Sequence, residues 1–140
     1  MGYRSDVVIS LKRKDFDRLK ETFLKNTEKE YTKLEEEYKK FKHDSVYNLM
    51  KEVTIWHEKK ADQKENDIIV FGWNGIKWYE EYFDVRFILN FLNKLEEENA
   101  PYKLIVMGED GYTEEAENYD CDDDSCDIIY AQHNIEIDKD

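Results

Sequence analysis

The chain has 140 residues, of which 39% are charged and 14% aromatic, and its formal net charge is −13. This length is typical of one domain, and so many aromatic residues argue against disorder, so we expect a single domain over residues 1–140. The charge disfavours direct nucleic-acid binding, because affinity for phosphates comes largely from Lys and Arg. No apolar stretch approaches the ~20 residues that span a membrane, and no apolar signal region opens the chain, which predicts a cytoplasmic protein without a membrane partner.

The first part of the chain predicts a strand, a helix and a second strand. Val7–Leu11 is a short β-rich run. Asp15 is placed to cap a helix with apolar positions at Phe16, Leu19 and Phe23. The apolar stripe resumes in a shifted register over Tyr31–Phe41, so we expect either a long helix with a shifted stripe or a break. Val53–His57 then alternates as a strand does.

The middle of the chain predicts a buried strand and the clearest helix. Ile68–Phe71 is apolar throughout, and Asn74-Gly75 beyond it fits either a hairpin turn or a bulge before a strand at Ile76–Tyr79. Asp84 is placed to cap a helix whose apolar stripe is Val85, Ile88, Leu89, Leu92 and Leu95. Pro101 stops that helix, because proline cannot continue it.

The last part predicts a strand at Tyr102–Met107, a turn at Gly108–Gly111, a weak edge strand over Tyr112–Tyr119 and a final strand region between Asp127 and Ile137. The resulting order is β-α-β-β-α-β-β. We therefore predict an α+β fold of two layers, with two helices packed on one face of a mostly antiparallel sheet, ferredoxin-like or related.

The charge is divided unevenly along the chain. The first 60 residues hold 15 basic and 12 acidic residues, whereas the remaining 80 hold 6 and 22. The extreme is an acidic segment at residues 109–127, which contains no Lys or Arg. Its ten acids are Glu109, Asp110, Glu114, Glu115, Glu117, Asp120, Asp122, Asp123, Asp124 and Asp127.

Two interpretations of this segment stay open. A block of like charges is often only a solvated, solubilising loop. Alternatively, the ten acids form a surface that binds a basic partner protein. In an extended segment Asp120, Asp122 and Asp124 would stand ~6.7 Å apart on one side, a spacing of the same order as backbone phosphates. The second interpretation thus predicts a nucleic-acid mimic.

Signals for catalysis and cofactors are weak. The three histidines are far apart, and no glycine-rich phosphate loop is present, so we expect neither enzymatic activity nor a cofactor. Asp120, Asp122 and Asp124 match three positions of an EF-hand loop, but Ser125 and Ala131 replace its glycine and glutamate. A cation site of another kind, or a small-ligand site, in the acidic segment remains an alternative.

An aromatic cluster offers a second contact surface. Trp73, Trp78, Tyr79, Tyr82 and Phe83 gather between the predicted strand and the Asp84 helix. Most of them are expected in the core, since aromatic residues are the main filler here. If Trp73 and Tyr79 were exposed, they would be anchors of a regulatory protein interface.

Three short segments carry a resemblance. Met1-Gly2-Tyr3-Arg4-Ser5-Asp6-Val7, the block Lys77-Trp78-Tyr79 with Asp84-Val85, and Gly108-Glu109-Asp110 resemble small uncharacterised proteins of tailed bacteriophages. The resemblance implies a phage protein acting in a bacterial cytoplasm, where small acidic inhibitors, anti-CRISPR proteins among them, act against host defence. We therefore expect a non-enzymatic inhibitor of a host nucleic-acid-binding or defence protein.

Overall fold

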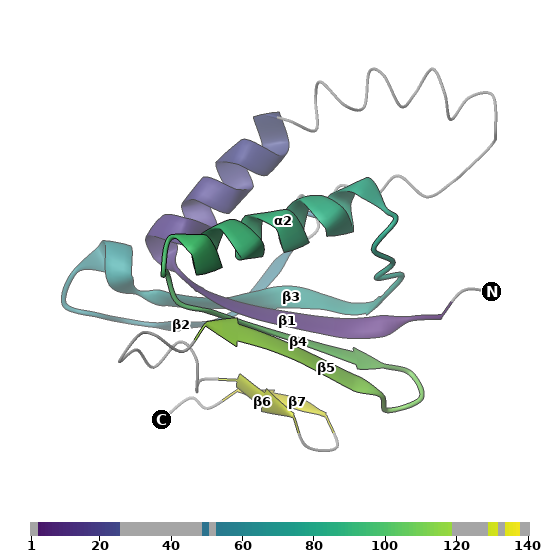
Figure 1. The fold of residues 1–140 in the computed structure, drawn as a ribbon. Helices are drawn as coiled ribbons and strands as arrows, with labels where there is room; N and C mark the ends of the chain where they lie inside the picture. The colour runs from purple at the N-terminus through teal and green to yellow at the C-terminus, as the bar shows by residue number, and fades with distance from the viewer. Residues whose placement is uncertain (1–2, 26–48, 51–52, 119–128, 132–133, 138–140) are drawn as a thin grey trace.

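The computed structural model describes residues 3–25, 49–50, 53–118, 129–131 and 134–137. Five strands form one sheet in the order β2-β3-β1-β4-β5, and every neighbouring pair is antiparallel (Figure 1). The strands are β1 (Ser5–Lys12), β2 (Thr54–Lys59), β3 (Ile68–Ile76), β4 (Tyr102–Gly108) and β5 (Thr113–Asn118). A single 3-10 turn, Lys64–Asn66, lies between β2 and β3.

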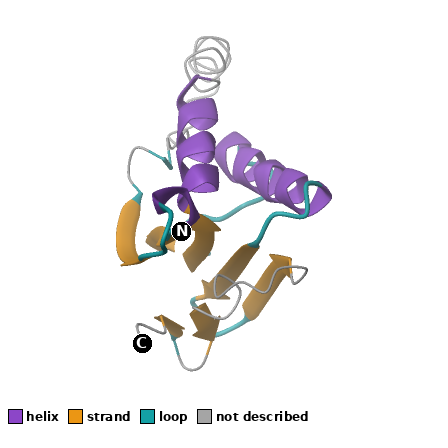
Figure 2. Ribbon diagram, turned by 90° about the vertical axis from the view of Figure 1, so that its left-hand side faces the viewer, coloured by secondary structure: helices purple, strands orange, loops and turns teal. Residues whose placement is uncertain are grey.

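Both helices lie on one side of this sheet (Figure 2). One is described over residues 13–25, and the other is α2 (Phe83–Glu97). The predicted two-layer α+β fold with helices on one face of an antiparallel sheet is therefore confirmed. In addition, β3 lies between β1 and β2, and β1 lies between β3 and β4, which is the interleaved arrangement of a ferredoxin-like β-α-β-β-α-β core, with β5 added at one edge. None of the helices in the described residues is long and apolar enough to cross a membrane.

The opposite face of the sheet is partly covered by a small hairpin. Its strands are β6 (Ile129–Ala131) and β7 (Ile135–Ile137), which pair only with each other (Figure 1). Ile129 is fully buried in a cluster with Val8, Val70 and Ile105. The final strand region of the sequence is therefore a separate hairpin below the sheet and not another strand of the sheet.

The main core lies between the sheet and the helices, as strand alternation requires. Val7, Ile9 and Leu11 face the helices, whereas Val8 faces the hairpin. The other half of the core comes from Phe16, Leu19 and Phe23 of the first helix and from the predicted stripe of α2, and Phe16 contacts Phe71 with ring centroids 4.8 Å apart. The part of the first stripe predicted over Tyr31–Phe41 lies outside the described residues.

The two predicted helix caps are wrong. The first helix begins at residue 13, directly after β1, so Asp15 lies within its first turn and is buried. Burial raises the pKa of the Asp15 carboxyl, against the opposing effect of Arg18. Tyr82 precedes α2, and Asp84 instead accepts a hydrogen bond from the backbone N–H of Leu49 at 3.3 Å. Both carboxylates are buried, and Asp15 lies 3.6 Å from the Arg18 guanidinium.

The predicted end of α2 is confirmed. Asn99 follows the helix with a φ of 58°, and the N–H of Ala100 bonds to the carbonyl of Leu95 at 2.8 Å. This is the left-handed helix ending that Asn tolerates, and Pro101 comes directly after it.

At the end of β3 the bulge alternative is the correct one. Ser5 pairs with Ile76 and Val7 pairs with Trp73, so two residues of β3 oppose one of β1. Gly75 has a φ of 62°, and its N–H bonds to the Asp6 carboxylate at 2.8 Å. The strand resumes after the bulge only at Ile76, and its expected continuation to Tyr79 is wrong, because residues 77–79 form the connection toward α2.

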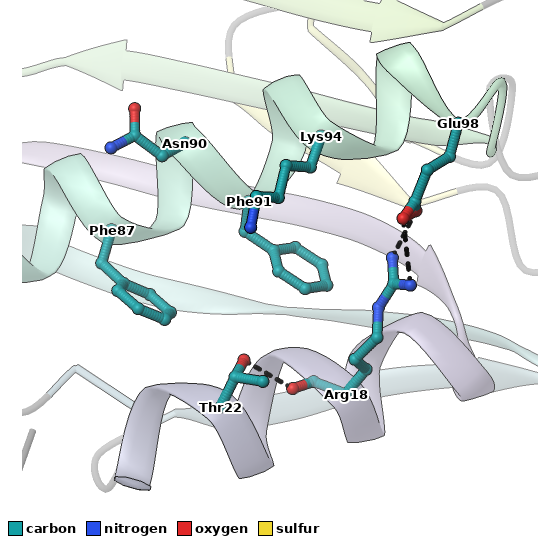
Figure 3. A pocket seen from close by; sticks show the side chains of 7 residues that line it. All are labelled: Arg18, Thr22, Phe87, Asn90, Phe91, Lys94 and Glu98. Atoms are coloured by element: carbon teal, nitrogen blue, oxygen red, sulfur yellow. Dashed lines mark hydrogen bonds and ion pairs between the residues drawn. The ribbon is translucent and has the colours of Figure 1, made fainter. Parts of the chain in front are cut away.

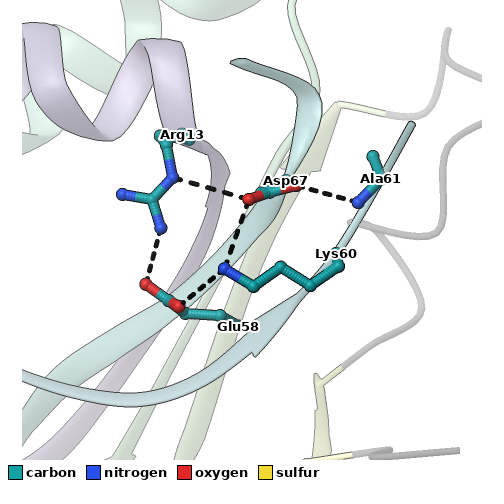
Figure 4. A network of polar contacts seen from close by, with 5 residues as sticks. All are labelled: Arg13, Glu58, Lys60, Ala61 and Asp67. Atoms are coloured by element: carbon teal, nitrogen blue, oxygen red, sulfur yellow. Dashed lines mark hydrogen bonds and ion pairs between the residues drawn. The ribbon is translucent and has the colours of Figure 1, made fainter. Parts of the chain in front are cut away.

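A network of charged residues joins the first helix to the β2–β3 connection (Figure 4). Arg13 contacts Glu58 at 2.6 Å and Asp67 at 3.6 Å, and Lys60 lies 3.6 Å from the same Asp67 carboxylate. Asp67 is buried and accepts a hydrogen bond from the N–H of Ala61 at 2.8 Å. These charges are engaged within the fold, so they stabilise it and are not a free binding patch.

Candidate functional site: an acidic groove

Five of the ten predicted acids lie in the described residues. Glu109 and Asp110 are in the turn between β4 and β5, and Glu114, Glu115 and Glu117 are in β5. The edge strand and the turn predicted there are thus both confirmed. The other five acids lie outside the described residues, and with them the predicted row of like-spaced carboxylates: Asp120, Asp122, Asp123, Asp124 and Asp127.

The two acids of the turn are engaged in local contacts. Asp110 accepts hydrogen bonds from the Tyr3 hydroxyl and from the N–H of Tyr112. Both hydrogen bonds lower the pKa of the Asp110 carboxyl, and the bond from Tyr3 has the larger effect. Glu109 accepts a long bond from the N–H of Arg4 at 3.4 Å. Glu109 and Asp110 therefore fix the turn to the N-terminal residues, although both stay exposed.

The three acids of β5 differ from one another because successive side chains of a strand face opposite sides. Glu114 is paired with Val106, which faces the helices, and Glu115 is paired with Ile105, which faces the hairpin. Glu117 lies 3.6 Å from the Lys103 ammonium, and both side chains are largely buried. Glu117 is therefore neutralised within the fold, whereas Glu114 and Glu115 are exposed and, among the described residues, have no ion pair or side-chain hydrogen bond.

Glu114 and Glu115 border a hollow that we call the acidic groove, with a volume of about 720 Å³. Its floor is apolar and comes from Leu89 of α2 and from Leu104 and Val106 of β4. One wall is residues 78–81, in the connection from β3 to α2, and the other is residues 112–116. Figure 1 shows this connection and the β4–β5 turn at the same end of the molecule as the N-terminus.

The charge of the acidic groove has a single sign. Its walls carry Glu80 and Glu81 on one side and Glu114 on the other, whereas Glu115 is on the same strand but faces the hairpin side of the sheet. No described residue that lines the groove is basic. All four glutamates are exposed, and none has an ion pair within the described part of the chain. Carboxylates and aromatic faces around an apolar floor suit a positively charged group with an aliphatic stem.

The aromatic cluster divides between core and groove. Trp73 is buried, and its indole N–H bonds to the carbonyl of Leu49 at 2.9 Å, so it is a core residue as expected. Trp78 lies against Trp73 with ring centroids 6.0 Å apart and is half-buried at the groove wall. Tyr79 is half-buried beside it and contacts Tyr82.

Three groove residues were missed by sequence reasoning. Tyr112 is 66% exposed at the groove wall, which makes it an aromatic contact open to a partner. Glu80 and Glu81 follow Trp78-Tyr79 directly in the sequence. Because Glu80 and Glu81 lie some thirty residues from β5 in the sequence, only the fold shows that they are close to the acids of that strand.

A smaller pocket of about 430 Å³ lies between the two helices (Figure 3). Arg18 reaches across it to Glu98 at 2.6 Å and lies over the Phe91 ring at 5.2 Å. Arg18 and Glu98 neutralise each other, so Lys94 is the one charged lining residue without an ion pair among the described residues, and this pocket carries less net charge than the acidic groove.

Within the described residues, no three His, Cys, Asp or Glu side chains are grouped as metal ligands. The three acids that match an EF-hand loop, Asp120, Asp122 and Asp124, lie outside those residues, as do the two cysteines of the chain, Cys121 and Cys126. Comparisons with protein-family models, with curated proteins and with solved structures found no match to this chain.

Proposed function

We propose that this chain is a non-enzymatic binding protein that receives a basic surface of another protein on the acidic groove and the β5 edge. The observation that carries the proposal is a set of three exposed, unpaired glutamates around an apolar and aromatic hollow, Glu80, Glu81 and Glu114, with a fourth, Glu115, on the other side of the same β5 edge. Such a site combines electrostatic attraction with aromatic anchors, which are the residues that dominate many interfaces.

The class of partner follows from the charge and from the phage resemblance. Proteins that bind nucleic acids carry basic surfaces, and a chain of net charge −13 is attracted to them over long range. A phage product with this property would act as an inhibitor of a host nucleic-acid-binding or defence protein. In the mimic form of this proposal, the acids between Asp120 and Asp127, which lie outside the described residues, also contact the partner.

The test is capture from bacterial lysate on the immobilised chain, followed by elution with rising salt and identification of what elutes. We expect one nucleic-acid-binding protein that is released by salt and displaced by added DNA. The double variant Glu114→Gln/Glu115→Gln should lose most of this capture. Glu65→Gln/Glu97→Gln is the matched control, because it removes the same charge from exposed sites outside the groove.

Capture that is indifferent to salt, to DNA and to the groove variant would contradict the proposal. It would favour the alternative of a regulatory protein that binds through its aromatic surface. The remaining alternative, a cation site in the acidic segment, predicts saturable calcium binding in a calorimetric titration of the full chain.

A further inference from the structure

The outer edge of β5 provides a place where a partner chain can pair with the sheet. β5 is the last strand of the sheet and pairs with β4 on one side only. Within the described residues, no strand pairs with its other side, so that side presents backbone N–H and carbonyl groups in strand geometry. This edge is also one wall of the acidic groove, so backbone pairing and side-chain recognition are available at the same place.

We propose that the acidic groove and the β5 edge together bind an extended basic segment of the partner protein, which adds to the sheet as a sixth strand beside β5. This inference rests on the proposed function and specifies its mode of recognition. Strand addition takes affinity from main-chain hydrogen bonds and specificity from the sites that receive alternate side chains.

The alternation of β5 predicts the sequence that the partner must carry. Glu114 and Glu115 are adjacent and face opposite sides of the sheet. In an added strand, the residues directly opposite them are also adjacent, and opposite charges in that position attract. The edge therefore selects two consecutive basic residues, one beside each glutamate.

The groove provides additional contacts for the basic side chain that lies beside Glu114. A Lys or Arg beside Glu114 lies on the side of the sheet that carries Leu104 and Val106. Its aliphatic stem can cover this floor while its charged end meets Glu80 or Glu81 across the groove. The rings of Trp78 and Tyr79 on the same wall add a cation–π contact.

The same charges select against other occupants of the edge. A second copy of this chain would place like charges opposite Glu114 and Glu115, which is destabilising. Edge strands are commonly protected in this way from pairing with themselves. A basic segment is instead attracted by Glu114 and Glu115. The charge of the edge therefore disfavours self-association and favours a basic partner.

The probe is a fluorescein-labelled ten-residue peptide of Thr and Val that carries one Lys-Arg pair at its centre. Fluorescence anisotropy is measured with the full chain and with its variants. We expect Glu114→Gln/Glu115→Gln to weaken peptide binding about fivefold to tenfold, and Glu65→Gln/Glu97→Gln to leave it within twofold. A peptide of the same composition with one Val between Lys and Arg should also bind more weakly, because its two charges face one side.

Two further peptides test backbone pairing directly. Each carries N-methyl groups on one of the two alternating sets of backbone amides. An added strand turns one set toward β5 and the other toward solvent, so one of these peptides should lose binding and the other should keep it. Any other pattern contradicts strand addition.

Failure of this inference is separable from failure of the proposed function. If the Lys-Arg peptide binds the groove variant as well as it binds the unaltered chain, strand addition is wrong. If capture of a basic partner still depends on Glu114 and Glu115 in that case, the proposed function stands. If capture does not depend on them either, both are wrong.

Discussion

At the scale of single residues, the indole of Trp73 joins the end of β3 to the segment that precedes β2. Its N–H donates to the carbonyl of Leu49 inside the core. Trp73→Phe keeps an aromatic ring but leaves that carbonyl without its partner. We expect the free energy of unfolding to fall by about 1–3 kcal/mol, the usual cost of an unsatisfied buried group.

Urea unfolding followed by circular dichroism measures this loss without depending on tryptophan fluorescence. Trp78→Phe is the control, since Trp78 is half-buried and makes no hydrogen bond among the described residues. A loss no larger for Trp73→Phe than for Trp78→Phe would show that the bond to Leu49 contributes nothing.

Asp67 is a residue at which stability should respond to acid, because its carboxyl is buried and its pKa is lowered. The N–H of Ala61 is the main cause that holds the pKa of its carboxyl below 3.8, and Lys60 and Arg13 lower that pKa further. A lowered pKa in the folded state gives stability that is present above about pH 4 and is lost as the pH falls through the folded value. Asp67→Asn should therefore reduce stability near neutral pH and flatten its decline in acid.

Urea midpoints measured from pH 7 to pH 3 check this expectation. Asp62→Asn is the control, because Asp62 is exposed in the same connection and has no ion pair or hydrogen bond in the described residues. An equal slope for Asp67→Asn and the unaltered chain would mean that other carboxylates, such as Glu58 beside Arg13, account for the acid response.

At the scale of elements, two glycines of β3 are required for different reasons: Gly72 because a side chain would clash, and Gly75 because of its backbone conformation. A Cβ at Gly72 would stand 1.9 Å from the carbonyl oxygen of Val7, so Gly72→Ala must push β3 away from β1. Gly75 has open space around it but a φ of 62°, which an alanine adopts at a cost of about 1–2 kcal/mol.

We therefore expect Gly72→Ala to destabilise the fold by more than about 3 kcal/mol, because it disrupts the pairing of the two central strands. Gly75→Ala should lose no more than about 2 kcal/mol. Thermal unfolding compares the two variants. Equal losses would contradict the close β1–β3 contact on which the core depends.

The elements that the sequence predicts well are those whose signal is local. The stripe from Val85 to Leu95 identifies a helix by its period, and Val53–His57 is rightly identified as strand, although a register shift between Ile55 and His57 and the exposure of Ile55 interrupt the expected alternation. The caps expected at Asp15 and Asp84 failed because burial in a tertiary core decides the partners of a carboxylate. The acidic groove was also out of reach, since it needs β4 and β5 beside the connection that follows β3.

At the scale of the whole molecule, paired charges and unpaired acidic charges lie in different parts of the structure. Arg13 and Arg18 of the first helix, and Lys60 directly after β2, are engaged in ion pairs with Glu58, Asp67 and Glu98. Much of the acidic excess lies later in the chain, where the groove and β5 carry unpaired glutamates. The surface proposed to bind a basic partner is thus on the β4–β5 side of the molecule, away from the edge formed by β2.

The most direct test of the acidic groove as the binding site is amide chemical-shift mapping of the ¹⁵N-labelled chain as the captured partner, or the Lys-Arg peptide, is added. The account predicts the largest chemical-shift changes at residues 78–81 and 112–116. In the variant Glu114→Gln/Glu115→Gln, these changes should be strongly reduced at the same concentration of partner or peptide. Changes confined to the pocket between the two helices, or to β2, would contradict it.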